Sequence, residues 1–315
     1  MCRPALALLA ALALAARPAS AQDQDFSKVE VKAEKVAGNV YVLYGAGGNI
    51  GVSVGEDGVL LVDDQFAPLA PKIEAAIKAI TDKPLRFVLN THWHSDHTGG
   101  NAPFSRHAIV IAHDNVRRRL AAGSPGLAGH VVPPAPQDAL PVLTFDHALT
   151  VHVNGEDIRA LHFAPGHTDG DVIVFFPRSN VVHMGDDFVT YGFPVVDVQS
   201  GGSVLGMVEE VNKAMAAVPD DVKVIPGHGK VSGKADVLKF TAMLDDAIGL
   251  VRAARARGRT LEQAKADKVL ARYDQLGQGF VKTDAFVELI YRELAPSTTP
   301  GRGAAPPPPP PRGAP

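Results

Sequence analysis

Three histidines and an aspartate stand within six positions of the segment THWHSDH, residues 91–97, in a chain with only 12 histidines among 315 residues. His92 and His94 project to one side of an extended segment, because side chains alternate along a strand. Asp96 and His97 follow after the chain turns and face the same space from another direction. Imidazole and carboxylate groups that converge in this way are typical metal ligands, so the segment indicates a metal site.

Three further polar residues recur in similar settings: His167 in PGHTDGD, Asp186 in MGDD and His228 in PGHG. Each follows an apolar, β-rich run and stands beside glycine, which lets the backbone approach a crowded site closely. A chance cluster on a polar surface would explain THWHSDH alone, but not this recurrence. The sequence therefore predicts one site built from four segments.

The elements that position these residues are readable in the first half of the chain. Alternating apolar residues and tight turns predict short strands over 29–64, and apolar residues at helical spacing predict a helix over 69–81. Pro84 ends that helix before a strand over 85–90. The first histidine motif thus lies at the end of a buried strand.

The second half repeats the strand-rich pattern from Leu149 onward, with a hairpin turn at Asn154-Gly155. Residues 204–217 and most of 234–295 have helical spacing. Two strand-rich halves, each flanked by helices, predict an α/β (α+β) fold in which two sheets pack face to face with helices outside.

Residues 121–141 are rich in glycine and proline, which predicts a long connection without regular structure. Such a loop serves either as a lid or substrate wall, or as a plain surface excursion. His130 lies in this loop and is the one candidate that we single out among the histidines outside the motifs.

The first 21 residues have the pattern of a signal peptide. Arg3 precedes an Ala/Leu run over 5–16, and a small-x-small cleavage pattern follows at 19–21. The run is shorter than the roughly 20 residues that span a bilayer. We therefore expect a periplasmic or secreted protein that begins near Gln22 and keeps no membrane anchor.

Cys2, the only cysteine, lies in this segment, so the mature protein would have neither disulfides nor thiolate ligands. Removal of Arg3 and Arg17 leaves 29 of the 31 basic residues against 34 acidic ones. This balance lacks the basic footprint of a nucleic-acid-binding protein. The expected partner is a small-molecule substrate, and the oligomeric state is left open.

The C-terminal part divides into two segments. Residues 246–295 form a helical extension that would either pack over the sandwich or form a dimer contact. Residues 296–315 are rich in proline, glycine and alanine, which predicts a disordered or polyproline tail, either solvated or bound to a partner.

The ordered series HWHSDH, GHTDGD, GDD and PGH resembles the metallo-β-lactamase superfamily over residues 26–245. The resemblance implies a four-layer αβ/βα sandwich with the metals at one sheet edge. It implies six ligands for two zinc ions: His92, His94 and His167 for the first, and Asp96, His97 and His228 for the second. Asp186 occupies the position of a carboxylate that bridges the ions. Asp63 resembles a buried aspartate that supports the histidine loop, and a loop-capping aspartate is the alternative for this residue.

The lactamase branch of the family has a cysteine where this chain has Asp186. Asp187 is a possible substitute for Asp186, but the alternation of side chains at the strand end directs only one of the two toward the metals. The site is thus composed of nitrogen and oxygen donors, which suit Zn²⁺, Mn²⁺ or Fe. The lysine that grips a substrate carboxylate in that branch is replaced here by Val189. The resemblance therefore does not by itself imply β-lactam hydrolysis.

Two cations about 3.5–4 Å apart hold a bridging hydroxide at neutral pH, because a bound metal lowers the pKa of water from about 15.7 to about 7. Asp96 is the candidate for orienting this hydroxide and shuttling its proton. The expected activity is hydrolysis of a small carbonyl compound: a cyclic amide such as a β-lactam, a lactone or an ester.

Two alternatives stay open. Some members of the family are iron oxygenases of sulfur compounds, with one iron held by residues equivalent to His92, His167 and Asp186. A non-catalytic metal-binding protein of an exported redox system would bind metal and show no turnover.

Overall fold

The computed structural model describes residues 25–125, 131–163 and 165–295. The predicted signal peptide, His130 and the proline-rich tail lie outside these residues. None of the helices within the described ranges is long and apolar enough to cross a membrane.

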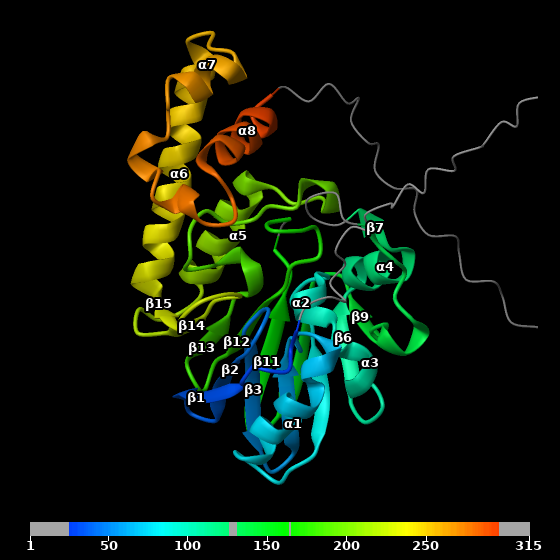
Figure 1. Cartoon of the computed structure of the whole chain (residues 1–315). Helices are drawn as coiled ribbons and strands as arrows, with labels where there is room; N and C mark the ends of the chain where they lie inside the picture. Colours follow the sequence, from blue (N-terminus) through cyan, green and yellow to red (C-terminus); the bar gives the residue numbers. More distant parts are fainter. Residues whose placement is uncertain (1–24, 126–130, 164, 296–315) are drawn as a thin grey trace, which may run out of the picture.

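Two large β-sheets form the centre of the protein (Figure 1). The first sheet, in spatial order, contains β1 (Lys32–Ala37), β2 (Val40–Tyr44), β3 (Ile50–Gly55), β4 (Gly58–Val62), β5 (Leu85–Leu89), β6 (Ile109–His113) and β9 (Leu143–Phe145). The second sheet contains β10 (Ala148–Val153), β11 (Glu156–Leu161), β12 (Ile173–Phe176), β13 (Val181–His183), β14 (Lys223–Ile225) and β15 (Ser232–Gly233).

The helices occupy the outer layers and the connections (Figure 1). They are α1 (Ala70–Lys78), α2 (Ser95–Thr98), α3 (Asn101–Phe104), α4 (Asp114–Ala122), α5 (Val204–Ala216), α6 (Lys234–Ala256), α7 (Leu261–Ala266) and α8 (Thr283–Glu293). The helices predicted over 69–81 and 204–217 correspond to α1 and α5.

Strand β4 lies between a helix layer and the second sheet, and all five of its residues are buried. Leu60 and Val62 pack between the two sheets, against residues of the second sheet such as Val174. Val59 and Leu61 pack on the other face with α1. A strand buried on both faces has a continuous apolar sequence, here GVLLV. The predicted sandwich of two sheets with helices outside is confirmed.

The predicted hairpin turn between β10 and β11 is also confirmed. Asn154 and Gly155 have φ angles of 55° and 68°, the left-handed conformations that a two-residue hairpin requires.

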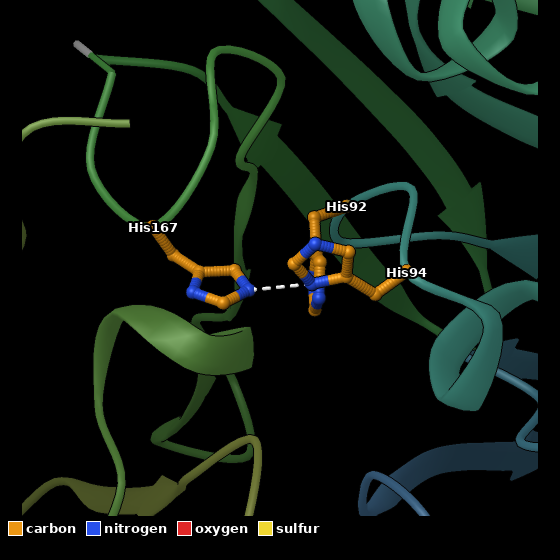
Figure 2. Close-up of side chains that lie close together, drawn as sticks. All are labelled: His92, His94 and His167. Atoms are coloured by element: carbon orange, nitrogen blue, oxygen red, sulfur yellow. Dashed lines mark hydrogen bonds between the residues drawn. The ribbon is translucent and has the colours of Figure 1, made fainter. Parts of the chain in front are cut away.

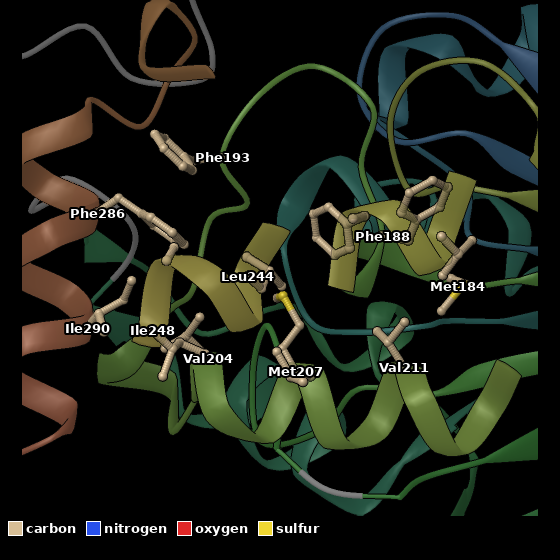
Figure 3. Packing of buried hydrophobic residues seen from close by; sticks show 14 of the residues in the cluster. Met184, Phe188, Phe193, Val204, Met207, Val211, Leu244, Ile248, Phe286 and Ile290 are labelled. Carbon is tan, nitrogen blue, oxygen red and sulfur yellow. The ribbon is translucent and has the colours of Figure 1, made fainter. Parts of the chain in front are cut away.

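The C-terminal helices pack on the outer face of the second sheet. Helix α6 continues across residue 245, the predicted boundary between the sandwich and the helical extension. Leu244 and Ile248 of α6 share one apolar core with Met207 of α5 and Phe286 of α8 (Figure 3). Of the two arrangements that the sequence left open for residues 246–295, the structure shows packing over the sandwich.

The connection over 121–141 differs from its prediction. Ser124–Pro125 (β7) and Val131–Val132 (β8) form a short antiparallel pair, and residues 137–139 form a 3₁₀ turn. The expectation of no regular structure is wrong for these residues. Gly123 has a φ of 68°, which lets the chain reverse after α4, and buried Leu140 anchors the return.

A substitution of Phe286 tests the packing of α8 against the core. The ring of Phe286 stacks on Phe193 with centroids 4.3 Å apart and is fully buried. We expect Phe286→Ala to lower the free energy of unfolding by about 3–5 kcal/mol, because it removes a large buried side chain. Urea denaturation measures this loss. Phe280→Ala, at a 68 % exposed position, is the control and should change the free energy by less than about 0.5 kcal/mol. Equal effects of the two variants would contradict the packing.

Candidate metal centre

The predicted site residues meet at one edge of the sandwich. His92 follows β5, His167 lies between β11 and β12, Asp186 follows β13, and His228 follows β14. Strands β4 and β5 are parallel, as are β13 and β14, so their carboxyl ends lie together. The four segments that the sequence predicts to form one site therefore lie together at this edge.

His92, His94 and His167 place one ring nitrogen each within 4.8 Å of one another (Figure 2). His94 Nδ1 and His167 Nε2 are only 2.8 Å apart. The other nitrogen of His94 lies 3.0 Å from Asp197 Oδ2, and that of His167 lies 2.7 Å from the Val195 carbonyl. Each outer nitrogen faces a hydrogen-bond acceptor, so in the neutral form of each ring this nitrogen carries the proton. Two lone pairs then face each other, an arrangement that a bound cation satisfies.

The orientations of His92 and His97 depend on Asp63. Thr91 Oγ1 donates to Asp63 Oδ2 at 2.8 Å, so this hydroxyl accepts the proton of His92 Nδ1, which lies 3.0 Å away. His97 Nδ1 donates directly to Asp63 Oδ2 at 2.7 Å. Both rings thus direct Nε2 into the site. His92 Nε2 is buried and has no hydrogen-bond partner among the described residues, as expected of a metal ligand.

Asp96, His97 and His228 form a second set of donors. His228 Nε2 lies 3.2 Å from Asp96 Oδ2 and 3.3 Å from His97 Nε2. Asp186 lies between the two sets: its Oδ1 is 3.3 Å from His97 Nε2, and its Oδ2 is 3.6 Å from His167 Nε2. One carboxylate is therefore placed to contact two ions.

Asp186 and Asp187 point to different sides of the chain, as the strand-end pattern predicted. They lie in a 3₁₀ turn in which Asp186 faces the histidines. Asp187 Oδ1 instead accepts the backbone N–H of His167 at 3.0 Å. Asp187 thus positions the His167 loop and does not join the donor set around Asp186.

Two glycines make room for the donors. A Cβ atom at Gly48 would overlap the imidazole of His97, and one at Gly227 would overlap Asp186 Oδ1. Gly48 belongs to the glycine-rich segment GAGGNIG, residues 45–51, whose role beside the site is not indicated by the histidine and aspartate motifs. Any larger residue at either position would displace a ligand.

The two donor sets differ in the pKa values of their histidines. Burial lowers the pKa of His167 to about 4 and holds that of His92 well below its usual value, so both rings are neutral at pH 7. Burial also opposes charge on His97, but Asp186, Asp96 and Asp63 outweigh it and raise the pKa of His97 well above its ordinary value. The carboxylate-rich side therefore favours a positive charge.

Sequence reasoning missed Asp197, Thr91 and Tyr191. Asp197 is buried, bonds to His94, and accepts the N–H of Ser200 at 3.0 Å, so its only sequence signal is that of a turn residue. Tyr191 is partly exposed, with its ring centroid 5.8 Å from that of His228, and lies at the rim of the site.

The fold and the donor set together define an αββα sandwich with a cluster of histidine and aspartate side chains at one edge that could hold metal ions. The family model of the metallo-beta-lactamase superfamily matches residues 38–229, and the chain belongs to this superfamily.

Curated relatives agree with this assignment. The chain is 27 % identical over 178 residues to the lactamase-like protein aptB of Emericella nidulans, covering 54 % of this chain and 51 % of that protein. It is 30 % identical over 158 residues to the hydroxyacylglutathione hydrolase of a Polaromonas species, covering 49 % of this chain and 51 % of the enzyme. The chain thus spans about half the length of these relatives.

Solved structures show the same fold. The metallo-beta-lactamase from Pontibacter korlensis superposes with a TM-score of 0.57 at 17 % identity, covering 69 % of this chain and 99 % of that one. The DIM-1 metallo-beta-lactamase gives 0.55 at 19 % identity, covering 70 % of this chain and all of the other.

Asp197 is predicted to contribute to metal affinity through His94. We expect Asp197→Asn to weaken binding at the first donor set about 10- to 100-fold, because a neutral amide accepts a weaker hydrogen bond than a carboxylate and supports the orientation and basicity of the ring less. Competition with a chromophoric chelator measures the affinity. Asp157→Asn is the control, since Asp157 also lies 2.7 Å from a histidine nitrogen, that of exposed His152. An unchanged affinity in Asp197→Asn would contradict the role.

Proposed function

We propose that this protein is an exported dinuclear zinc hydrolase of small carbonyl compounds: a cyclic amide such as a β-lactam, a lactone or an ester. The observation that carries the proposal is the pair of donor sets on either side of Asp186. Export is supported by the sequence of residues 1–21 and would be tested by the mass of the mature chain, expected to begin near Gln22.

The residues present fit two zinc ions. Five histidines supply nitrogen donors and two aspartates supply oxygen donors: His92, His94, His97, His167, His228, Asp96 and Asp186. Zinc accepts both kinds of donor. When bound, the two ions supply an activated water at neutral pH and polarise the carbonyl to be attacked.

The chain's own residues provide the remaining functions. Asp96 is the more exposed of the two carboxylates among the donors, and its Oδ2 lies 3.2 Å from His228 Nε2. It is placed to orient the attacking water and to receive its proton. Trp93 and Leu140 form part of an apolar cluster beside the histidine segment, which holds that segment in place.

The site has no lysine at position 189 to bind a substrate carboxylate, which favours a substrate without that group. Val189 is buried and forms a β-bridge with His228, so this position offers no cation to a substrate carboxylate. Tyr191 instead presents an aromatic ring and a hydroxyl at the rim. The names of the relatives, which include a hydroxyacylglutathione hydrolase, a metallo-beta-lactamase and a carboxyl ACP thioesterase, support carbonyl hydrolysis.

An iron oxygenase is the second candidate. Asp186 Oδ2 lies 3.6 Å from His167 Nε2, and His92 faces the same space, which gives two histidines and one carboxylate for a single iron. That activity would leave Asp96, His97 and His228 without a ligand role. A non-catalytic metal-binding protein would retain the metal and turn over neither class of substrate.

Metal stoichiometry separates these candidates. We expect two zinc ions per chain in protein purified without added metal, and one in His228→Ala, because the first donor set stays intact. Elemental analysis of the purified proteins measures both values. His152→Ala, which changes an exposed histidine, should retain two ions. One iron per chain in the unmodified protein would reverse the order of the candidates.

A substrate screen tests the reaction class. Zinc-loaded protein should hydrolyse at least one compound among β-lactams, lactones and aryl esters, and His92→Ala should abolish this turnover because a ligand is lost. Initial rates with each compound at several concentrations measure kcat/KM. Rates no higher than those of His92→Ala on all three classes would refute the proposal.

A further inference from the structure

A second group of acidic side chains, which we call the acidic cluster, lies behind His167: Asp171, Asp187 and Glu210. They come from the loop that follows His167, the turn after β13 and the middle of α5. All three are buried, with exposed fractions of 3 %, 1 % and 0 %. One oxygen from each lies within 4.8 Å of the others. Three carboxyl groups buried together require a compensating charge or proton.

Two of these carboxyl groups already accept hydrogen bonds from the His167 loop. Asp171 accepts from the backbone N–H of Thr168 at 2.6 Å and from its hydroxyl. Asp187 accepts from the backbone N–H of His167 at 3.0 Å. Donors of this kind favour the ionised form of a carboxyl group.

Glu210 is different, because within the described part of the chain neither of its side-chain oxygens makes a hydrogen bond of normal geometry, although the backbone of Phe163 lies near enough to favour its ionised form. Its position is nonetheless defined. A Cβ atom at Gly166 would overlap Asp187 Oδ1 and would lie 2.9 Å from Glu210 Oε2, so the two oxygens converge beside the backbone of Gly166. Lys213, one turn along α5, pairs with exposed Glu209. The unpartnered carboxylate is thus directed into the cluster.

We infer that Asp171, Asp187 and Glu210 bind a hard divalent cation of the Ca²⁺ and Mg²⁺ class. The donors are all oxygens, which such cations prefer, whereas the histidine-rich site suits zinc. The cation supplies the charge that the buried carboxylates lack. Burial raises the pKa of Asp171 and of Glu210 well above their ordinary values, and a bound cation would reverse this by favouring the ionised forms.

This cation would join three segments that surround the His167 ligand. Asp171 bonds to Thr168, Asp187 bonds to His167, and Glu210 belongs to α5. The role is structural: the cation fixes the loop of one zinc ligand without contacting substrate. It does not rest on the hydrolase proposal, since a metal-binding protein without turnover would have the same cluster.

The test uses the full-length protein, loaded with zinc and freed of calcium and magnesium by dialysis. Calcium chloride and magnesium chloride are then titrated separately, with bound cation measured by equilibrium dialysis and Tm by calorimetry. We expect one calcium or magnesium ion in addition to the zinc. At about 100-fold above its Kd this ion should raise Tm by on the order of 5 °C.

Glu210→Gln should lose the additional ion and the rise in Tm while it keeps the zinc. Glu209→Gln is the matched control, because it removes the same charge from the exposed neighbour on α5 and should behave as the unmodified protein. Equal binding by Glu210→Gln, or no binding of either cation by the unmodified protein, would overturn the inference. If the unmodified protein bound neither cation, the three carboxyl groups of the acidic cluster would instead share protons. Should Glu210→Gln not fold, the titration of the unmodified protein still decides.

Discussion

The carboxylate of Asp63 is the group on which both sets of ligands depend. Its Oδ2 accepts from Thr91 Oγ1 and from His97 Nδ1, and its Oδ1 accepts from the Thr91 backbone N–H at 2.7 Å. Through Thr91 it orients His92 of the first donor set, and by its direct hydrogen bond it orients His97 of the second donor set. Asp63 has a φ of 66°, a conformation uncommon for a residue with a side chain. The backbone strain is retained because the surrounding hydrogen bonds compensate for it.

The layers of the fold bring the remaining ligands to Asp63. Asp63 and Thr91 follow parallel strands of the first sheet, whereas His167, Asp186 and His228 come from the second half of the chain. The apolar side chains between the sheets hold the two halves together. A site of this kind tolerates little movement, since the donor atoms lie within a few ångströms of one another. The rigidity of the inner core therefore supports the chemistry at its edge.

The sequence predicted the sandwich and the meeting of its ligands because both depend on local patterns. Strand alternation, strand ends and histidine spacing are readable over a few residues. The partner of His94 was not predictable: Asp197 lies 103 positions away in a turn without a motif. Glu210, in contrast, has a signal in the sequence. It shares the helical face of buried Met207, Val211 and Ala214, which indicates a buried carboxyl group, whereas Glu209 beside it is exposed. Which residues that carboxyl group meets is a property of the assembled fold.

The C-terminal helices connect to this site through α5. Glu293 at the end of α8 accepts hydrogen bonds from Ser203 Oγ and from the backbone N–H groups of Val204 and Leu205, so it caps the first turn of α5. A carboxylate at a helix N-terminus is stabilising there because it meets free N–H groups and the positive end of the helix dipole. The same turn contacts the ligand loop, since Ser203 N donates to the Gly166 carbonyl at 2.8 Å. The extension thus does more than cover an apolar face: it fixes the helix against which the His167 loop is held.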